Sequence, residues 1–158
     1  MVAKIGASYN IEMARALPGQ VSDTSAYNID GACVLNDGEI LVGTAVQVKE
    51  IDNFGDKVVK SMKGGGTPYG VAIRSHFQTT SKDGRMIYEN ESGINVMTSG
   101  RCWIISGNSA AQTFGAPVKL KEDGTAKDDG TIVTGWTYTG DFTKFGDVNL
   151  AEVQLHQL

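Results

Sequence analysis

Histidine and serine side chains are the first candidates for chemistry in this 158-residue sequence, which contains two histidines, His76 and His156. Serine becomes a nucleophile when a histidine, itself oriented by an aspartate, takes its proton. Ser92 and Ser99 each precede a glycine, and neither lies in a G-x-S-x-G pattern. A serine beside a glycine is typical of a turn. We therefore interpret both serines as turn residues and His76 as an ordinary strand residue.

Metal ligands are the second possibility. Cys33 and Cys102 lie far apart in the sequence, and no cysteine or histidine has the spacing of a zinc site. A calcium loop needs oxygen ligands at alternating positions and a glycine at the sixth, and the acidic stretch 123–128 has a lysine inside it and no such register. We predict no metal and no cofactor, and we interpret the cysteines as two buried thiols. Whether they pair is left open.

A third possibility is a phosphate-binding loop at Gly64-Gly65-Gly66. Such a loop needs a lysine and a serine or threonine after its last glycine, followed by a helix. Here Thr67-Pro68 follows instead. We interpret this segment as a surface or contact loop. Together with the missing catalytic patterns, it leads us to predict that the chain is not an enzyme.

Glycine-containing turns divide the chain from Ala32 onward. Asp-Gly and Asn/Gly clusters supply the positive φ angles that hairpin turns need, and short strands between them at intervals of roughly 8–12 residues indicate a sandwich or barrel. The expected turns include one at Ser99-Gly100. The expected strands are Ala32–Leu35, Ile40–Val48, Val58–Met62, Val71–Phe77, Ile94–Thr98, Arg101–Ile105, Pro117–Leu120, Thr131–Tyr138 and Val148–His156. We predict an all-β fold: a single compact β-barrel or sandwich of about eight or nine short strands.

Alternation along two of these strands predicts which face is buried. Val42, Val46 and Val48 are separated by even numbers of positions in the first strand, and so are Ile132, Thr134, Trp136 and Tyr138 in the second. Because successive side chains in a strand point to opposite faces, each strand has one largely apolar face for a core. The final strand, close to the chain end, is expected to be ordered only if it pairs with another.

The first thirty residues have a different character. Small and polar residues separate the apolar ones, and Pro18-Gly19 interrupts the segment. A short helix over Ile11–Leu17 is possible, although an isolated helix of that length is marginal in water. We predict an extended amino-terminal arm over residues 1–30 and a β-rich domain over residues 31–158. A frayed terminus is the alternative for the arm.

The charge balance and hydropathy limit the partners. Fourteen Lys and Arg against eighteen Asp and Glu give a net charge of −4, and no basic cluster is present. We therefore predict no nucleic-acid partner, because nucleic-acid binding depends on clustered cations. No stretch has the length of a membrane span or the pattern of a signal peptide. We expect synthesis in a cytoplasm and no membrane partner.

Five short patterns occur in an order that resembles the structural cement or head decoration proteins of tailed bacteriophages. They are Leu17–Asp23 (LPGQVSD), Ile40–Val46 (ILVGTAV), Tyr69–Ile73 (YGVAI), Val96–Ile104 (VMTSGRCWI) and Phe114–Val118 (FGAPV). The resemblance covers Leu17 to Val118. It does not extend to the last forty residues, from Lys119 to Leu158, for which only the β-pattern is informative.

The resemblance implies a capsid protein of the virion, added to the outside of an expanded head to resist internal DNA pressure. Its implied partners are the major capsid protein and further copies of itself, commonly as a homotrimer. An arm that becomes ordered on docking would supply an extended contact. The candidate contact residues of the arm are an apolar stripe with one cation: Tyr9, Ile11, Met13, Arg15 and Leu17.

Other classes remain open from the sequence. A tail or adaptor protein would share the β-rich character but assemble into rings or tubes. A small trimeric all-β hydrolase would need an acidic and tyrosine constellation around a phosphate loop, which the sequence does not show. A ligand-binding module is the remaining alternative.

Overall fold

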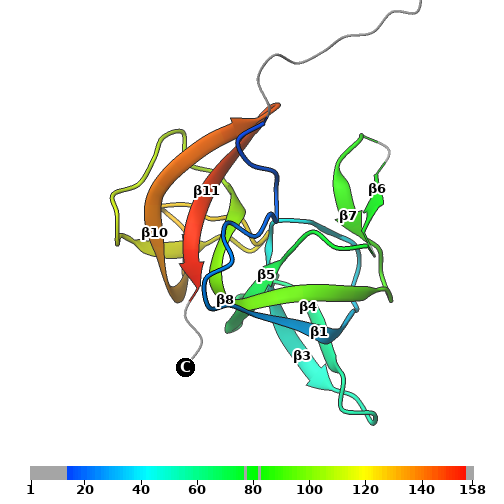
Figure 1. Cartoon of the computed structure of the whole chain (residues 1–158). Helices are drawn as coiled ribbons and strands as arrows, with labels where there is room; N and C mark the ends of the chain where they lie inside the picture. Colours follow the sequence, from blue (N-terminus) through cyan, green and yellow to red (C-terminus); the bar gives the residue numbers. More distant parts are fainter. Residues whose placement is uncertain (1–13, 77, 82, 156–158) are drawn as a thin grey trace, which may run out of the picture.

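The computed structural model describes residues 14–76, 78–81 and 83–155 (Figure 1). Within these residues every regular element is a strand, so the described part contains no helix that could cross a membrane. This confirms the all-β prediction. The strands are β1 (Asn28–Leu35), β2 (Ile40–Leu41), β3 (Ala45–Ile51), β4 (Lys57–Ser61), β5 (Pro68–Ala72), β6 (Thr79–Thr80), β7 (Met86–Tyr88), β8 (Gly93–Ser106), β9 (Pro117–Leu120), β10 (Ile132–Phe145) and β11 (Val148–Leu155).

Five strands close into a barrel. Their order is β1-β4-β3-β5-β8, and β1 pairs with β8 to complete the ring. Every pairing in the ring is antiparallel except β1 with β4, which is parallel. The interior holds fully buried aliphatic side chains, including Leu35, Val46 and Val59. Closing the sheet leaves few unpaired edges, which protects a β-protein from unwanted strand addition.

A second sheet continues from the same β8. Its carboxyl-terminal half, from Gly100 to Ser106, pairs with β11, and β10 and β9 follow in that order (Figure 1). β11 is therefore held on both sides, by β8 and by β10. The prediction that the final strand is paired is confirmed.

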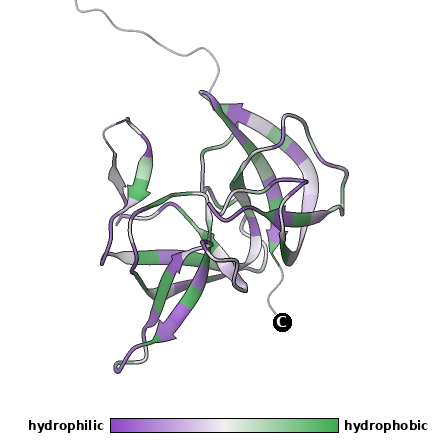
Figure 2. Cartoon of the chain, turned by 180° about the vertical axis from the view of Figure 1, so that it is seen from behind, coloured by the Kyte–Doolittle hydropathy of each residue, from purple (hydrophilic) through white to green (hydrophobic). Residues whose placement is uncertain are grey.

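Two cores use opposite faces of the same barrel strands. Neighbouring buried pairs occur at Ala45-Val46 on β3, Val71-Ala72 on β5 and Val96-Met97 on β8. In each pair one residue points into the barrel and the other packs under the second sheet. Elsewhere hydrophobic and hydrophilic residues alternate along the strands (Figure 2). Trp136 and Tyr138 are buried on the apolar face predicted for β10, and Val42 and Val46 are buried as well, but β3 is buried on both faces, because Ala45 and Gln47 are also buried.

The turn predicted at Ser99-Gly100 is wrong. Both residues lie inside β8, where Ser99 pairs with Asn28 and Gly100 pairs with Leu155. Gly100 has φ 105°, so the strand bends there and passes from the barrel into the second sheet. A glycine with positive φ can bend a strand as well as reverse it, and its partners lie elsewhere in the sequence.

Other strand boundaries also differ from the prediction. The segment Ile40–Val48 is divided into β2 and β3 by a turn at Gly43, whose N–H donates to the carbonyl of Ala72 at 2.8 Å. The strand predicted over Val71–Phe77 ends at Ala72, and His76 is an exposed bend residue rather than a strand residue. The small β2-β7-β6 sheet was not predicted, because β6 has only two residues and no alternation to detect.

Candidate functional site

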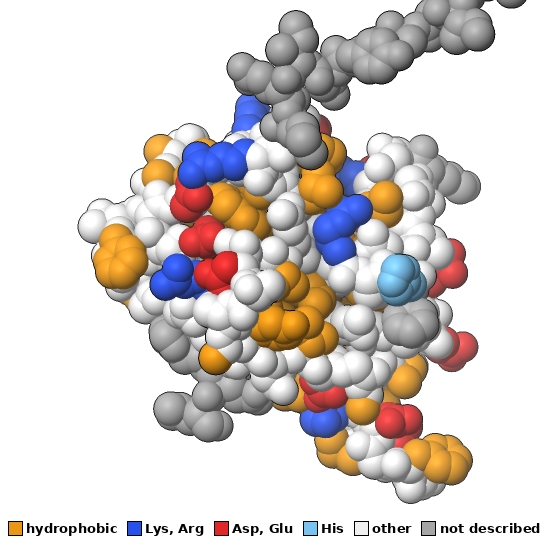
Figure 3. All heavy atoms as spheres, in the orientation of Figure 1, with side chains coloured by type: hydrophobic (Ala, Val, Ile, Leu, Met, Phe, Trp, Pro, Cys, Tyr) orange, Lys and Arg blue, Asp and Glu red, His pale blue; other side chains and the backbone are white. Residues whose placement is uncertain are grey.

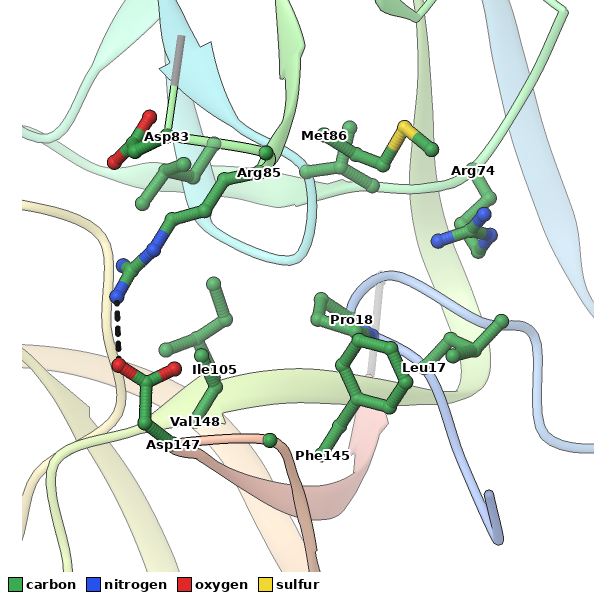
Figure 4. Close-up of a pocket in the computed structure, with 14 residues that line it drawn as sticks. Leu17, Pro18, Arg74, Asp83, Arg85, Met86, Ile105, Phe145, Asp147 and Val148 are labelled. Carbon is green, nitrogen blue, oxygen red and sulfur yellow. Dashed lines mark ion pairs between the residues drawn. The ribbon is translucent and has the colours of Figure 1, made fainter. Parts of the chain in front are cut away.

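A groove separates the small sheet from the turn that joins β10 to β11. Its volume is about 640 Å³. Apolar side chains come from distant parts of the chain (Figure 4): Leu17 and Pro18 from the amino-terminal segment, Leu41 and Met86 from the small sheet, and Ile105, Phe145 and Val148 from the second sheet. The groove is therefore created by the way the two sheets are placed.

Charged side chains lie at the rim of this groove. Arg85 and Asp147 face one another from opposite walls, with Nη2 and Oδ2 3.6 Å apart (Figure 4). Both are exposed, and ion pairs of this kind contribute little to stability. Arg74 and Asp83 complete the charged part of the lining. The site thus combines an apolar floor with a rim that presents both signs of charge.

The amino-terminal segment reaches the groove because it pairs with an edge of β8. The N–H of Gly19 donates to the carbonyl of Trp103 at 2.9 Å, and the N–H of Trp103 donates to the carbonyl of Gln20 at 3.0 Å. Gly19 also lies close to the turn between β2 and β3, where a Cβ on Gly19 would lie 2.5 Å from Cγ1 of Val42. Ala16, which is 1% exposed, packs with Trp103 and Leu150 on the outer face of the second sheet.

The five predicted contact residues divide into two groups. Arg15 binds Asp141 on β10, with Nη2 and Oδ1 2.6 Å apart, and Leu17 lines the groove. Tyr9, Ile11 and Met13 lie outside the described residues. The possible helix over Ile11–Leu17 does not form in its described part, because residues 14–17 are irregular and Ala16 and Leu17 face different surroundings.

A cluster of titratable groups connects β1, β4 and β5 of the barrel. The carboxylate of Asp30 accepts hydrogen bonds from the hydroxyl of Tyr69 and from the ammonium of Lys57, the latter at 2.9 Å. Burial raises the pKa of Asp30, but these two donors outweigh it and hold the pKa below its ordinary value. Burial, together with Asp30, raises the pKa of Tyr69. The cluster keeps an ionised acid and a protonated phenol, an arrangement that stabilises three strands.

The two cysteines are buried free thiols, as interpreted from the sequence. Burial raises the pKa of Cys33 to about 12, and burial likewise raises that of Cys102. Such thiols stay protonated at neutral pH and are poor nucleophiles. They belong to different cores, Cys33 to the barrel interior and Cys102 to the core under the second sheet.

The serine and metal-ligand candidates from the sequence show no arrangement for chemistry among the described residues. The hydroxyl of Ser92 donates to the carbonyl of Glu89 at 2.7 Å, which fits the predicted turn. Among the described residues there is no group of three or more His, Cys, Asp or Glu placed to hold a metal ion.

Exposed aromatic side chains mark two loops. Phe54, at the tip of the β3–β4 hairpin, is 92% exposed, and Phe114, in the loop before β9, is 76% exposed. The carboxylate of Asp52 accepts hydrogen bonds from the N–H groups of Phe54 and Asp56, at 2.8 and 2.9 Å, and so orders the hairpin tip. A hydrophobic group is visible at the end of this projecting hairpin (Figure 3).

The full sequence matches the family model of the structural cement proteins over residues 5–156. The chain belongs to this family. A chain in a solved structure described as "The capsid of Myoviridae Phage XM1" has a similar fold, with a TM-score of 0.62 and 19% sequence identity over 94% of this chain and 95% of that one. No curated protein matches the sequence.

Family membership makes this chain a structural cement protein, which is a component of the phage capsid and so of the virion. It associates with capsid proteins. The family match also extends the sequence resemblance, which reached only from Leu17 to Val118. The match also includes residues 119–156, which supply β10 and β11 and one wall of the groove.

The groove of the cement protein is the candidate site that sequence reasoning missed. Its walls join Leu17, Met86 and Val148, and no local pattern indicates that such distant positions meet. Phe54 had a signal that was not used, since an aromatic residue inside the turn sequence Asn53-Phe54-Gly55-Asp56 has no strand face to pack against. Large exposed hydrophobic side chains at such positions are candidates for contacts with partners.

Proposed function

We propose that this chain attaches to the outer surface of the expanded phage head and stabilises the contacts between major capsid protein subunits. The observation that carries the proposal is the family match over nearly the whole chain. We also propose that it acts by binding and not by catalysis. This is supported by the protonated, buried thiols and by a polar cluster whose groups are satisfied by one another.

Binding of this kind explains how a small protein strengthens a shell. A protein that binds the expanded state and not the disassembled one stabilises the expanded state by mass action, by about 2.7 kcal/mol for each site at a free concentration one hundred times the Kd. Many copies on one capsid add their contributions. Modest individual contacts then suffice, especially if copies are linked to each other.

The arm is the proposed extended contact of this attachment. The sequence predicts an arm over residues 1–30; since residues 28–30 belong to β1 and Ala16 is buried on the body, the proposed arm is residues 1–13. Tyr9, Ile11, Met13, Arg15 and Leu17 are the proposed contact residues with capsid or neighbouring subunits. Alternation supports this choice, because Tyr9, Ile11 and Met13 are two residues apart and share one side of an extended chain. Arg15 and Leu17 in turn have partners on the body, Asp141 and the groove.

Deletion of residues 2–13 tests both proposals. Wild-type protein and the deletion variant are added to expanded heads that lack cement protein, and bound protein is measured after sedimentation. We expect saturable binding of the wild type, a rise in the temperature at which the heads break, and at least tenfold weaker binding of the variant. Wild-type protein that stays in solution would overturn the capsid role. Equal binding by both proteins would show that the arm is not a capsid contact.

The deletion ends at residue 13 for a structural reason. A longer deletion, to residue 17, would also remove Ala16, which is buried against Trp103 and Leu150. Weaker binding of that variant would not distinguish a loss of folding from the loss of a capsid contact. A matched control stays within the arm. The triple substitution Tyr9→Ser, Ile11→Ser and Met13→Ser should weaken binding to the heads. The double substitution Asn10→Ser and Glu12→Ser, on the opposite side of an extended chain, should not.

A homotrimer is the proposed assembly of the free protein. Three copies of a 16.8 kDa chain would present three arms to the capsid at once. The mass measured by light scattering during size-exclusion chromatography tests this. About three times the chain mass is expected, and a ring of five or more copies would contradict the trimer.

A further inference from the structure

The groove between the small sheet and the β10–β11 turn has the size and lining of a binding site. Its volume of about 640 Å³ falls within the roughly 300–1,000 Å³ that is typical of such sites. The floor is apolar, through Leu41, Met86 and Val148, while Arg74 and Arg85 stand at the rim. A ligand with an apolar side and some polar groups would fit this chemistry.

We propose that the groove of one copy of the chain binds the amino-terminal arm, residues 1–13, of a second copy. The inference rests on the proposed self-association and names the surface that makes it. The occupant is a segment of the protein itself, so every copy would carry both a groove and the arm that fits a neighbour's groove.

The arm has the composition that the groove requires. Tyr9, Ile11 and Met13 alternate with Asn10 and Glu12, so an extended arm has an apolar side and a polar side. From residue 9 to residue 13 an extended chain covers about 13 Å. The apolar side would lie on the groove floor. Asn10 and Glu12, on the other side, would lie toward the rim, which carries both signs of charge: Arg74 and Arg85 together with Asp83 and Asp147.

The path of the chain favours a second copy as the source of the arm. Leu17 is itself part of the groove wall. Upstream of it, Ala16 packs against Trp103 and Leu150 and Arg15 binds Asp141 on β10, so the second sheet holds both residues just before the arm. Thirteen residues in an extended chain reach up to roughly 45 Å, which is enough to reach an adjacent copy.

Cysteine cross-linking between two differently tagged chains tests the proposal. One chain carries Ile11→Cys in the arm and the other carries Met86→Cys in the groove. The native Cys33 and Cys102 are buried and should not react. We expect a covalent dimer of the two chains on a non-reducing gel after mild oxidation of the mixture, at several times the level that either chain gives alone.

Three other outcomes would overturn the proposal and are distinguishable. If the mixture gives no link but a single chain with both substitutions closes on itself as a compact monomer, the arm belongs to its own groove. If neither links while light scattering still shows an oligomer, the groove is not the arm's site and the proposed trimer stands. If no oligomer forms at all, the proposed self-association fails as well.

A pair of matched charge substitutions gives an independent measurement. Val148→Asp places a carboxylate in the groove wall, whereas Val133→Asp places one on β10 at a residue that is 74% exposed and outside the groove. We expect at least tenfold weaker self-association for Val148→Asp and none of this loss for Val133→Asp. Equal self-association of the two variants would count against the groove.

Discussion

Asp30 joins three strands of the barrel through one carboxyl group. It lies on β1 and binds Lys57 on β4 and Tyr69 on β5, and its other oxygen accepts the N–H of Ala32 at 2.9 Å. Its side chain is only 12% exposed. β1 and β4 form the parallel pairing of the barrel, so the carboxylate reinforces this pairing and also connects β1 with β5.

Replacing this carboxylate should lower stability in a pH-dependent way. We expect Asp30→Asn to reduce the free energy of unfolding by about 1–3 kcal/mol at neutral pH, because hydrogen bonds to a charged acceptor are lost. The folded pKa lies below the ordinary value of 3.8, so the ionised carboxylate stabilises the fold above that value and the contribution is lost as the pH falls through the folded pKa. The difference from wild type should therefore shrink between about pH 5 and about pH 2.

Urea unfolding of both proteins across this pH range measures the effect. Asp129→Asn, which changes an exposed carboxyl in the same way, is the matched control and should leave stability nearly unchanged. A difference between Asp30→Asn and wild type that stays constant down to about pH 2 would show that the ionised carboxylate is not the stabilising group.

At the scale of elements, β8 connects the two halves of the molecule. Residues before Gly100 pair with β1 and β5 of the barrel, and residues after it pair with β11. The strand therefore contributes to both cores, through Val96 in the barrel and Ile104 under the second sheet. The bend at Gly100 sets the position of one sheet relative to the other, and hence the position of the groove walls.

A side chain at this bend should be costly. Gly100 has φ 105°, and an added Cβ would lie 2.7 Å from Cβ of Tyr27. We expect Gly100→Ala to lower the free energy of unfolding by about 2–4 kcal/mol, since strain from positive φ adds to crowding. Thermal or urea unfolding measures it.

Gly38 provides a close control for this prediction. Its φ is 104°, but an added Cβ would meet nothing within 4 Å. Gly38→Ala therefore carries the cost of the backbone conformation alone, about 1 kcal/mol. If the two variants lose equal stability, crowding at the β8 bend contributes nothing and the bend tolerates a side chain.

At the scale of the whole molecule, exposed aromatic residues lie on separate projections. Phe54 is at the tip of the β3–β4 hairpin, and Phe114 is in the loop before β9 on the far side of the molecule (Figure 1). Neither contributes much to the cores. Aromatic residues are enriched among those that dominate binding energy at interfaces, so a protein that spans several neighbours gains from carrying them at its extremities.

A substitution at Phe54 tests capsid binding without a large change in stability. We expect Phe54→Ala to change the free energy of unfolding by less than about 0.5 kcal/mol, because the side chain is 92% exposed, and to weaken binding to expanded heads at least tenfold. Sedimentation with heads and urea unfolding are the two measurements. Asn53→Ala, in the same tip, is the control for binding. Unchanged capsid affinity in Phe54→Ala would exclude this hairpin as a contact.

The all-β class was predictable because its signals are local. Alternation of Val42, Val46 and Val48 and of Trp136 and Tyr138 depends on the pleat of a single strand, and Asp-Gly turns depend on the φ of one residue. The same locality explains the errors. Gly100 has the φ expected of a turn but bends a strand, and Val71–Phe77 ends early because β5 has pairing partners only as far as Ala72.

The sequence alone was enough to predict the all-β class, and its ordered short patterns resembled the family to which the chain belongs. The three-dimensional structure was needed to show that β8 is shared by a barrel and a second sheet, and that Leu17, Met86 and Val148 line one groove. Strand formation follows from neighbours in the chain, whereas the groove depends on strand pairings that bring together residues more than sixty positions apart, such as Leu17 and Met86. Such pairings are selected by the packing of the whole molecule and leave no local pattern.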